Sequence, residues 1–287
     1  MSRLLLAAAL MIAAGNAVAQ STDPAPASAT PEPRRKLPLM AEEAIARGYE
    51  LPLPFGAGAI LTYLDGRKID VTDVRVGIDG NTQSVNDYAV LNSSSTVFNA
   101  NFRFDTWILP FLNVYALVGY VHNDSATNIH VTLPRPGPIP GTIERDIAVD
   151  TSLDGTVGGV GMTLAAGYKN FFMVMDYNYN RADLGFDDKF TARIGTLRAG
   201  WQGKVSGRGI QVWLGGGNWD TAATASGHTV LEDGRTFTFE ADQQPDTEWM
   251  YDIGVNFMPT PHWQLFADFG TDFDGGSFAV IGPTYRF

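Results

Sequence analysis

The chain ends on the stretch SFAVIGPTYRF, residues Ser277 to Phe287, and this stretch decides the fold. Every second residue, counted back from the end, belongs to an apolar set, and the alternate set is mixed around Arg286 and Thr284. A period of two with one apolar face is typical of a β-strand. An edge strand of a soluble β-protein would look the same, so the rest of the chain has to distinguish the two. The apolar set consists of Phe287, Tyr285, Pro283, Ile281 and Ala279.

This ending resembles the C-terminal strand of bacterial outer-membrane β-barrels. In that group the strand ends in Phe and carries a second aromatic residue two positions earlier, as Phe287 and Tyr285 do here. The barrel-assembly machinery is known to recognise that strand. The resemblance therefore implies that Tyr285 and Phe287 are an assembly signal, and that this machinery and periplasmic chaperones are partners during biogenesis.

The N-terminus predicts export. Arg3 precedes a short apolar run at residues 4–14, and Ala17-Val18-Ala19 is a typical cleavage site, so residues 1–19 are expected to be a signal peptide cut near Ala19. Residues 20–39 are rich in Pro, Ala, Ser and Thr, which predicts a disordered periplasmic leader. Residues 40–48 contain good helix formers and end at Gly48, which predicts one short helix. The barrel is expected to occupy residues 52–287.

Composition excludes several classes of protein. The net charge of −11 makes nucleic acid an unfavourable partner, and the absence of Cys excludes disulfides and thiolate metal sites. The mean hydropathy is −0.05, and no apolar run reaches the roughly 18 residues that a spanning helix needs. A transmembrane barrel has the same average, because its strands alternate between apolar and polar residues.

The links between alternating segments follow a regular order of lengths. Between 96 and 107, Phe98, Phe102 and Phe104 alternate with polar residues, and similar strands follow along the chain. Short links are expected at 109–112, 167–170, 202–208 and 259–262, and long ones at 123–153, 181–189 and 220–246. Outer-membrane barrels show this asymmetry, with short periplasmic turns and long external loops.

The sequence therefore predicts an all-β, antiparallel, up-and-down transmembrane β-barrel. Ten strands are expected, with Asp65-Gly66 as a turn and residues 65–95 as an external excursion that carries its own hairpin. The alternative is twelve strands, with 69–79 and part of 80–93 as an extra spanning pair. A hairpin is also expected inside 220–246, around Asp233-Gly234.

Aromatic residues gather at both ends of the expected strands, as in the belts that contact lipid headgroups. Outer-membrane lipid and lipopolysaccharide are therefore expected partners, with the outer membrane of a Gram-negative bacterium as the location. Residues 102–121 and 50–58 are also similar to stretches in a group of uncharacterised bacterial outer-membrane barrels, which implies architecture and no activity. The belts are expected to contain Trp107, Phe111, Tyr115, Tyr168, Trp201, Phe257, Trp263 and Tyr285 near the short turns, and Tyr63, Tyr120, Tyr179, Phe190, Trp219, Trp249 and Phe273 near the long loops.

No catalytic pattern stands out. The four His residues are expected in loops or at rims, and none has a Ser two residues on, as barrel lipid A deacylases do. The Asp-x-His triplet of outer-membrane aspartyl proteases is absent too. The acidic groups Asp183–Asp187–Asp188 and Asp272–Asp274 are best explained as solvated loops, so no catalytic, cofactor-binding or metal-binding residue is predicted.

The remaining candidates are polar residues expected to line the lumen. If the lumen is open, this acid-rich set favours cations; if it is closed, Arg103 and Arg286 pair with the acids in a plug. The function predicted is thus a non-catalytic barrel, either structural or a narrow cation-preferring pore. The alternative is a surface adhesion barrel acting through its long external loops, and a lipid-modifying enzyme or protease is less favoured. The lumen-lining set is Asn99, Asn101, Arg103, Asp105, Asp176, Asn178, Asn180, Asp252, Asn256, Asp268 and Arg286.

Overall fold

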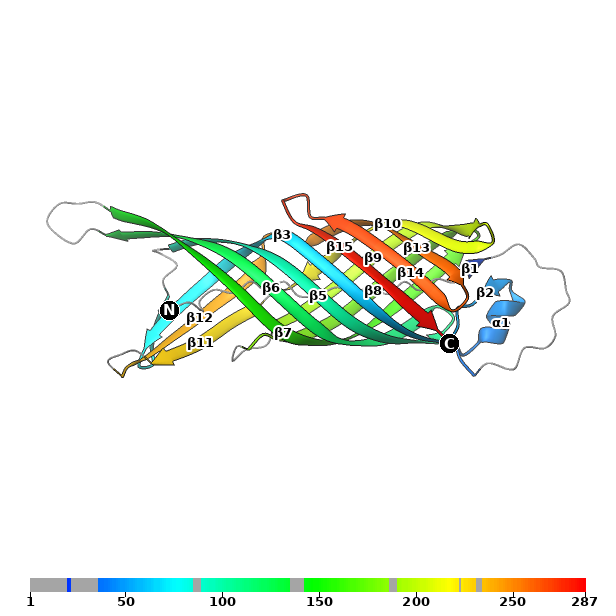
Figure 1. The fold of residues 1–287 in the computed structure, drawn as a ribbon, viewed down its shortest axis with the longest axis horizontal. Helices are drawn as coiled ribbons and strands as arrows, with labels where there is room; N and C mark the ends of the chain where they lie inside the picture. Colours follow the sequence, from blue (N-terminus) through cyan, green and yellow to red (C-terminus); the bar gives the residue numbers. More distant parts are fainter. Residues whose placement is uncertain are drawn as a thin grey trace.

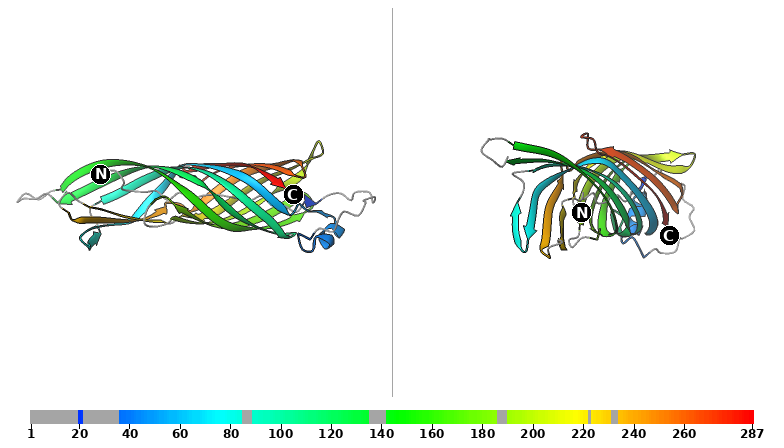
Figure 2. Two further views of the ribbon diagram at one scale, coloured as in Figure 1. Left: turned by 60° about the horizontal axis from the view of Figure 1, so that its bottom comes forward. Right: turned by 60° about the vertical axis from the view of Figure 1, so that its left-hand side comes forward.

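The computed structural model describes residues 20–21, 36–84, 89–134, 142–185, 190–221, 223–230 and 234–287. An antiparallel sheet dominates it and closes on itself (Figures 1 and 2). Ten strands form the closed barrel, which confirms the expected number and shows that the twelve-strand alternative is wrong. The expected signal peptide and residues 22–35 of the leader lie outside the described residues.

Each barrel strand pairs with two neighbours in the barrel, and β3 pairs with both β5 and β15 to close it. The strands are β3 (Phe55–Ile78), β5 (Ala89–Leu109), β6 (Leu112–Pro134), β7 (Thr142–Tyr168), β8 (Phe171–Asp183), β9 (Phe190–Val205), β10 (Arg208–Asp220), β13 (Trp249–Thr260), β14 (Trp263–Thr271) and β15 (Ser277–Arg286).

The last residues of the chain make the closing contact. The backbone N–H of Phe55 donates to the carbonyl of Phe287 at 3.1 Å, and that of Phe287 donates back at 3.0 Å. The two rings stack with centroids 5.8 Å apart. Closure pairs the first and last strands, so neither remains an open edge at this end of the barrel. We call this end, which holds the C-terminus and the tight turns, the short-turn end, and the opposite end the far end.

Replacing Phe287 by Ala is expected to lower the yield of folded barrel in the membrane several-fold, because it removes the closing ring contact and the expected assembly signal. Folded protein is measured in membrane fractions by its heat-dependent migration on mild-detergent gels. Phe273→Ala is the matched control, since Phe273 is 77% exposed and lies in a far-end turn. Equal folded yields for the two variants would contradict the prediction.

Four consecutive barrel strands continue far beyond the others at the far end (Figure 1). β7 has 27 residues and β14 has 9, which at about 3.3 Å per residue correspond to about 90 Å and about 30 Å. β12 (Thr236–Pro245) adds to the extended part of β3, β11 (Ala223–Val230) pairs with β12, and β4 (Asn81–Ser84) folds back on β3. The hairpin expected in 220–246 is thus confirmed. We call this projecting sheet, in the order β11-β12-β3-β5-β6-β7, the far-end sheet.

Two sequence expectations in this region are wrong. Asp65-Gly66 is not a turn, because β3 runs through it as a bulge, with a register shift between Leu64 and Arg67 and a φ of 68° at Gly66. Most of the expected loop 123–153 is strand as well. The reason is that residues 123–128 are polar or small on both faces of the strand, so hydrophobic alternation is interrupted there although the backbone pairing continues.

The N-terminal segment lies against the short-turn end (Figure 1). It contains α1 (Ala41–Ala46) and β2 (Tyr49–Glu50), which pairs with β1 (Gln20–Ser21). The N–H of Leu39 donates to the carbonyl of Ile108 at 2.8 Å, and Glu50 pairs with Lys204 at 3.1 Å. Among the described residues, the helix is too short to cross a membrane.

Candidate functional site

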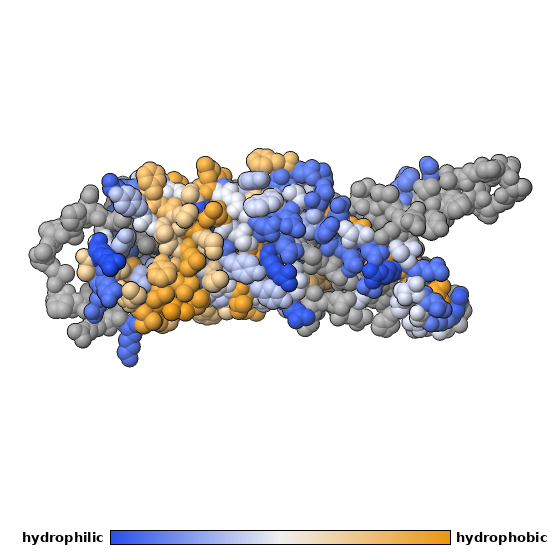
Figure 3. Space-filling view, turned by 180° about the vertical axis from the view of Figure 1, so that it is seen from behind, coloured by the Kyte–Doolittle hydropathy of each residue, from blue (hydrophilic) through white to orange (hydrophobic). Residues whose placement is uncertain are grey.

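Figure 3 shows an apolar band across the visible face of the barrel, in the half nearer the short-turn end, with mostly hydrophilic residues beyond it. Large exposed apolar side chains on each of the ten barrel strands continue this band as a belt. Large side chains that face outward in the belt remain exposed, for example Phe104, Met173 and Leu214. So continuous an apolar surface is unfavourable in water and is satisfied by lipid. The chain is therefore a transmembrane β-barrel of the outer-membrane type, and its interior and far-end sheet are the candidate functional regions.

Four of the aromatic residues expected in the belts lie in the interior instead. Trp107, Tyr115, Phe190 and Trp219 are each 5% exposed or less. Their position follows from the period of two, because Trp107, for example, shares its face of β5 with Asp105.

All eleven predicted lumen-lining side chains are buried. None is more than 8% exposed, and they point to the face of the sheet opposite the belt. Many of them form hydrogen-bonded clusters across neighbouring strands, which we call together the polar layer. Three clusters make up this layer.

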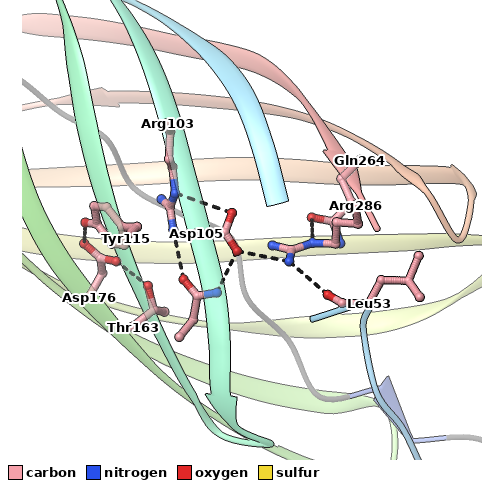
Figure 4. Close-up of polar contacts among 9 residues, drawn as sticks. Leu53, Arg103, Asp105, Tyr115, Thr163, Asp176, Gln264 and Arg286 are labelled. Atoms are coloured by element: carbon pink, nitrogen blue, oxygen red, sulfur yellow. Dashed lines mark hydrogen bonds and ion pairs between the residues drawn. The ribbon is translucent and has the colours of Figure 1, made fainter. Parts of the chain in front are cut away.

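The first cluster lies at the short-turn end (Figure 4). Asp105 accepts hydrogen bonds from Asn113 at 2.7 Å and from Arg286 at 3.0 Å. Arg286 also donates to Gln264 at 2.9 Å and to the carbonyl of Leu53 at 3.3 Å. This last bond ties the N-terminal segment to the barrel interior.

Asp176 is the centre of the second cluster. It accepts hydrogen bonds from Thr163 at 2.6 Å, from Tyr115 at 2.8 Å and from Asn178 at 3.2 Å. The guanidinium of Arg103 lies 3.7 Å from the centre of the Tyr115 ring, which is a close cation–π contact. The buried carboxylate of Asp176 is therefore held by three neutral donors and by no directly bonded cation among the described residues.

Arg198 holds the third cluster together. Its Nε donates to Asp252 at 3.0 Å and its Nη2 donates to Asp268 at 2.7 Å. Trp213 donates its indole N–H to the other oxygen of Asp268 at 3.2 Å. All three charged side chains are 3% exposed or less. The sequence did not single out Arg198, because its strand is weakly alternating; the only signal was that it shares a face with Thr196 and Gln202.

A second interior layer is apolar, and the sequence did not predict it. On several strands its members lie farther from the short-turn end than the polar layer: on β5, Val97 lies beyond Asn99, and on β13, Met250 lies beyond Asp252. Trp219 and Phe278 meet in it with ring centroids 4.8 Å apart. We call this cluster the apolar layer. Its main members are Leu64, Val97, Val121, Val157, Ile194, Trp219, Met250 and Phe278.

The His side chains that the structure describes do not form a catalytic site with these layers. His122 lies at the outer surface, where its Nδ1 is 2.8 Å from a carboxylate oxygen of Asp154 and its Nε2 is 3.2 Å from one of Asp124. The Nδ1 of His130 is 2.6 Å from a carboxylate oxygen of Asp146. The hydrogen bond to Asp146 raises the pKa of His130 above its ordinary value. His262 contacts the carbonyl of Arg286 at 2.8 Å.

Metal ligation finds little support in the described ranges. No group of three or more His, Cys, Asp or Glu residues there is placed to hold a metal ion. Asp272 instead accepts hydrogen bonds from the backbone N–H groups of Asp274 and Gly276, at 2.7 and 2.8 Å, and shapes a turn. Asp187 and Asp188 lie outside the described residues.

No protein-family model and no curated protein matches the chain. Among solved structures, the transport unit of the autotransporter AIDA-I from Escherichia coli is 9% identical with a TM-score of 0.40, covering 82% of this chain and 90% of that one. An outer-membrane channel from Pseudomonas putida F1 is 10% identical with a TM-score of 0.37, covering 83% and 97%. The Acinetobacter baumannii protein Omp33 is 11% identical with a TM-score of 0.28, covering 83% and 99%. Similarity this distant assigns no activity.

Proposed function

We propose that this outer-membrane β-barrel is a closed, non-catalytic anchor that holds the far-end sheet at the cell surface. The observation that carries the proposal is the apolar layer, which lies in the interior beyond a polar layer whose charged side chains are already hydrogen-bonded. A cation crossing the apolar layer would lose hydration against apolar side chains and would meet the buried guanidinium of Arg67 beside Trp219, and both are unfavourable. The barrel then contributes stability and orientation, and the far-end sheet provides the interaction surface.

A narrow cation-preferring pore is the second candidate. The polar layer contains four buried acids, Asp105, Asp176, Asp252 and Asp268, and three buried Arg residues, Arg103, Arg198 and Arg286. The excess of one negative charge would favour cations if the interior opened. The apolar layer is the reason to prefer the closed barrel.

Wild-type protein refolded from the full mature chain is expected to give no conductance steps in a planar lipid bilayer. A general porin inserted under the same conditions serves as the positive control, and heat-dependent gel migration verifies that the tested protein is folded. Reproducible cation-selective steps from the wild type would overturn the closed barrel and favour the pore.

Absence of catalysis is also part of this proposal. The described His side chains contact carboxylates or a backbone carbonyl at the surface or the rim, away from the buried acids. A surface role also agrees with the length of β3, β5, β6 and β7, since strands that serve only to span a bilayer need about ten residues.

A further inference from the structure

We infer that the free edge of β7 in the far-end sheet is a docking site for an extended polypeptide segment with basic residues at alternate positions. The inference rests on the proposed role of the far-end sheet as an interaction surface and names the partner that fits it. Three observations carry it: an open strand edge, the direction of the backbone groups along that edge, and a row of acidic side chains beside it.

The edge is open over the far part of β7. Residues 142–155 pair with β6 in an unbroken register that runs from Pro134↔Thr142 to Val121↔Gly155. On the other side, β8 pairs with β7 only as far as Thr156↔Asp183. Within the ranges that the structure describes, no other strand pairs with residues 142–155. An unpaired strand edge of this length is a template for a further strand.

The register shows which residues offer their backbone to a partner. The N–H of Ala165 donates to the carbonyl of Phe111 at 2.9 Å, so Ala165 points its backbone groups toward β6. In an antiparallel strand this direction alternates from one residue to the next, and the β6–β7 register has no shift. The backbone N–H and C=O groups of odd-numbered β7 residues therefore hydrogen-bond with β6. Even-numbered residues from 142 to 154 direct both N–H and C=O to the free side.

The same even-numbered residues carry the charge. Glu144, Asp146, Asp150 and Asp154 are all exposed on the outer face. The groups facing them from β6 are His130, beside Asp146, and His122 and Asp124, beside Asp154. Side chains directly opposite each other on paired strands lie about 5 Å apart and interact. An incoming strand with Lys or Arg at every second position would place a cation opposite each acid.

A second copy of this chain fits the edge poorly. Two β7 edges would place acids against acids, and like charges in directly opposed positions destabilise pairing. The charge pattern thus favours a basic partner strand and disfavours self-association through this edge.

The test uses the full mature protein, refolded in an uncharged detergent, and fluorescence anisotropy of two labelled ten-residue peptides. One alternates Lys with Thr and Val, and the other has the same composition with its Lys residues contiguous. The alternating peptide is expected to bind, with an affinity that falls as salt is added, and the contiguous peptide is expected to bind at least about ten-fold more weakly. Equal binding of the two peptides would overturn the inference.

A pair of variants tests the backbone contribution. Ala148→Pro removes an N–H on the free side and leaves the β6 bonds in place, so it is expected to weaken binding about ten-fold. Ala148→Val keeps the N–H and is expected to bind like the wild type. If Ala148→Pro does not fold, an alternating peptide N-methylated on the edge-facing positions provides the same test and should lose binding. Unchanged binding in either test would refute docking by strand addition.

Failure of this inference is distinguishable from failure of the proposed function. Folded, non-conducting protein that binds neither peptide overturns the docking site and leaves the closed anchor in place. Wild-type conductance, in contrast, overturns the closed barrel whatever the peptides do.

Discussion

Arg198→Met is expected to lower the free energy of unfolding by about 3–5 kcal/mol, because it leaves two buried carboxylates without their shared cation. Asp252 and Asp268 both receive hydrogen bonds from Arg198, and none of the three is more than 3% exposed at its side chain. The Met side chain fills similar space and supplies no donor. Two desolvated carboxylates then repel each other without a cation between them, and this strongly destabilises the folded barrel.

The measurement is urea unfolding in lipid vesicles, followed by Trp fluorescence. Arg193→Met is the matched control on the same strand: Arg193 is 62% exposed and pairs with Asp220 at 3.6 Å, and exposed pairs contribute about 1 kcal/mol or less. Adding Asp252→Asn and Asp268→Asn to Arg198→Met is expected to restore most of the stability, since the repulsion disappears. A loss of under about 1 kcal/mol for Arg198→Met alone would contradict the proposed balance of buried charge.

The double variant Trp219→Ala, Phe278→Ala is expected to convert the closed barrel into a conducting one. These two rings are 2% and 4% exposed and meet in the apolar layer. Their removal opens space that the remaining aliphatic side chains do not fill, and it costs about 3–5 kcal/mol per aromatic residue. It also removes the ring contact of Arg67, whose guanidinium lies 5.8 Å from the centre of the Trp219 ring. Water can then reach the polar layer.

Planar-bilayer recording is the readout, and the steps are expected to favour cations because acids outnumber Arg residues in the polar layer by four to three. Trp249→Ala is the control, since Trp249 is 55% exposed on the outside of the barrel. A folded double variant that remains silent would place the seal in the ion-paired polar layer and not in the apolar one.

The candidate site was predictable where alternation was clear. On β5 and β8, polar residues at every second position must share one face, so the burial of Asn99, Asn101, Asp176 and Asn178 follows from the period of two once the outer face is apolar. Arg198 and Trp219 lie on strands rich in Gly, where the period is weak, and there the sequence did not separate interior from belt.

The far-end sheet shows the opposite limit. Residues 123–128 are polar or small on both faces and interrupt the hydrophobic alternation, which returns in residues 129–133 and 143–153. A loop is nevertheless expected there from the sequence, because a strand that spans a bilayer needs only about ten residues. Their strand structure comes from backbone pairing of β6 with β7 and of β6 with β5, which continues beyond the spanning part of the barrel. Only the tertiary structure therefore shows which strand edge remains open and which charges line it.

The sequence by itself determined the closed barrel, its ten strands and the lipid-facing side of each clear strand, down to Phe287 and Tyr285 on the last one. It did so because alternation and turn length are local properties that each segment carries alone. The tertiary structure decided which interior charges pair, which apolar side chains cluster inside the barrel, and how far β3, β5, β6 and β7 project. Those features depend on which strands become neighbours and on their register, and no single segment encodes that.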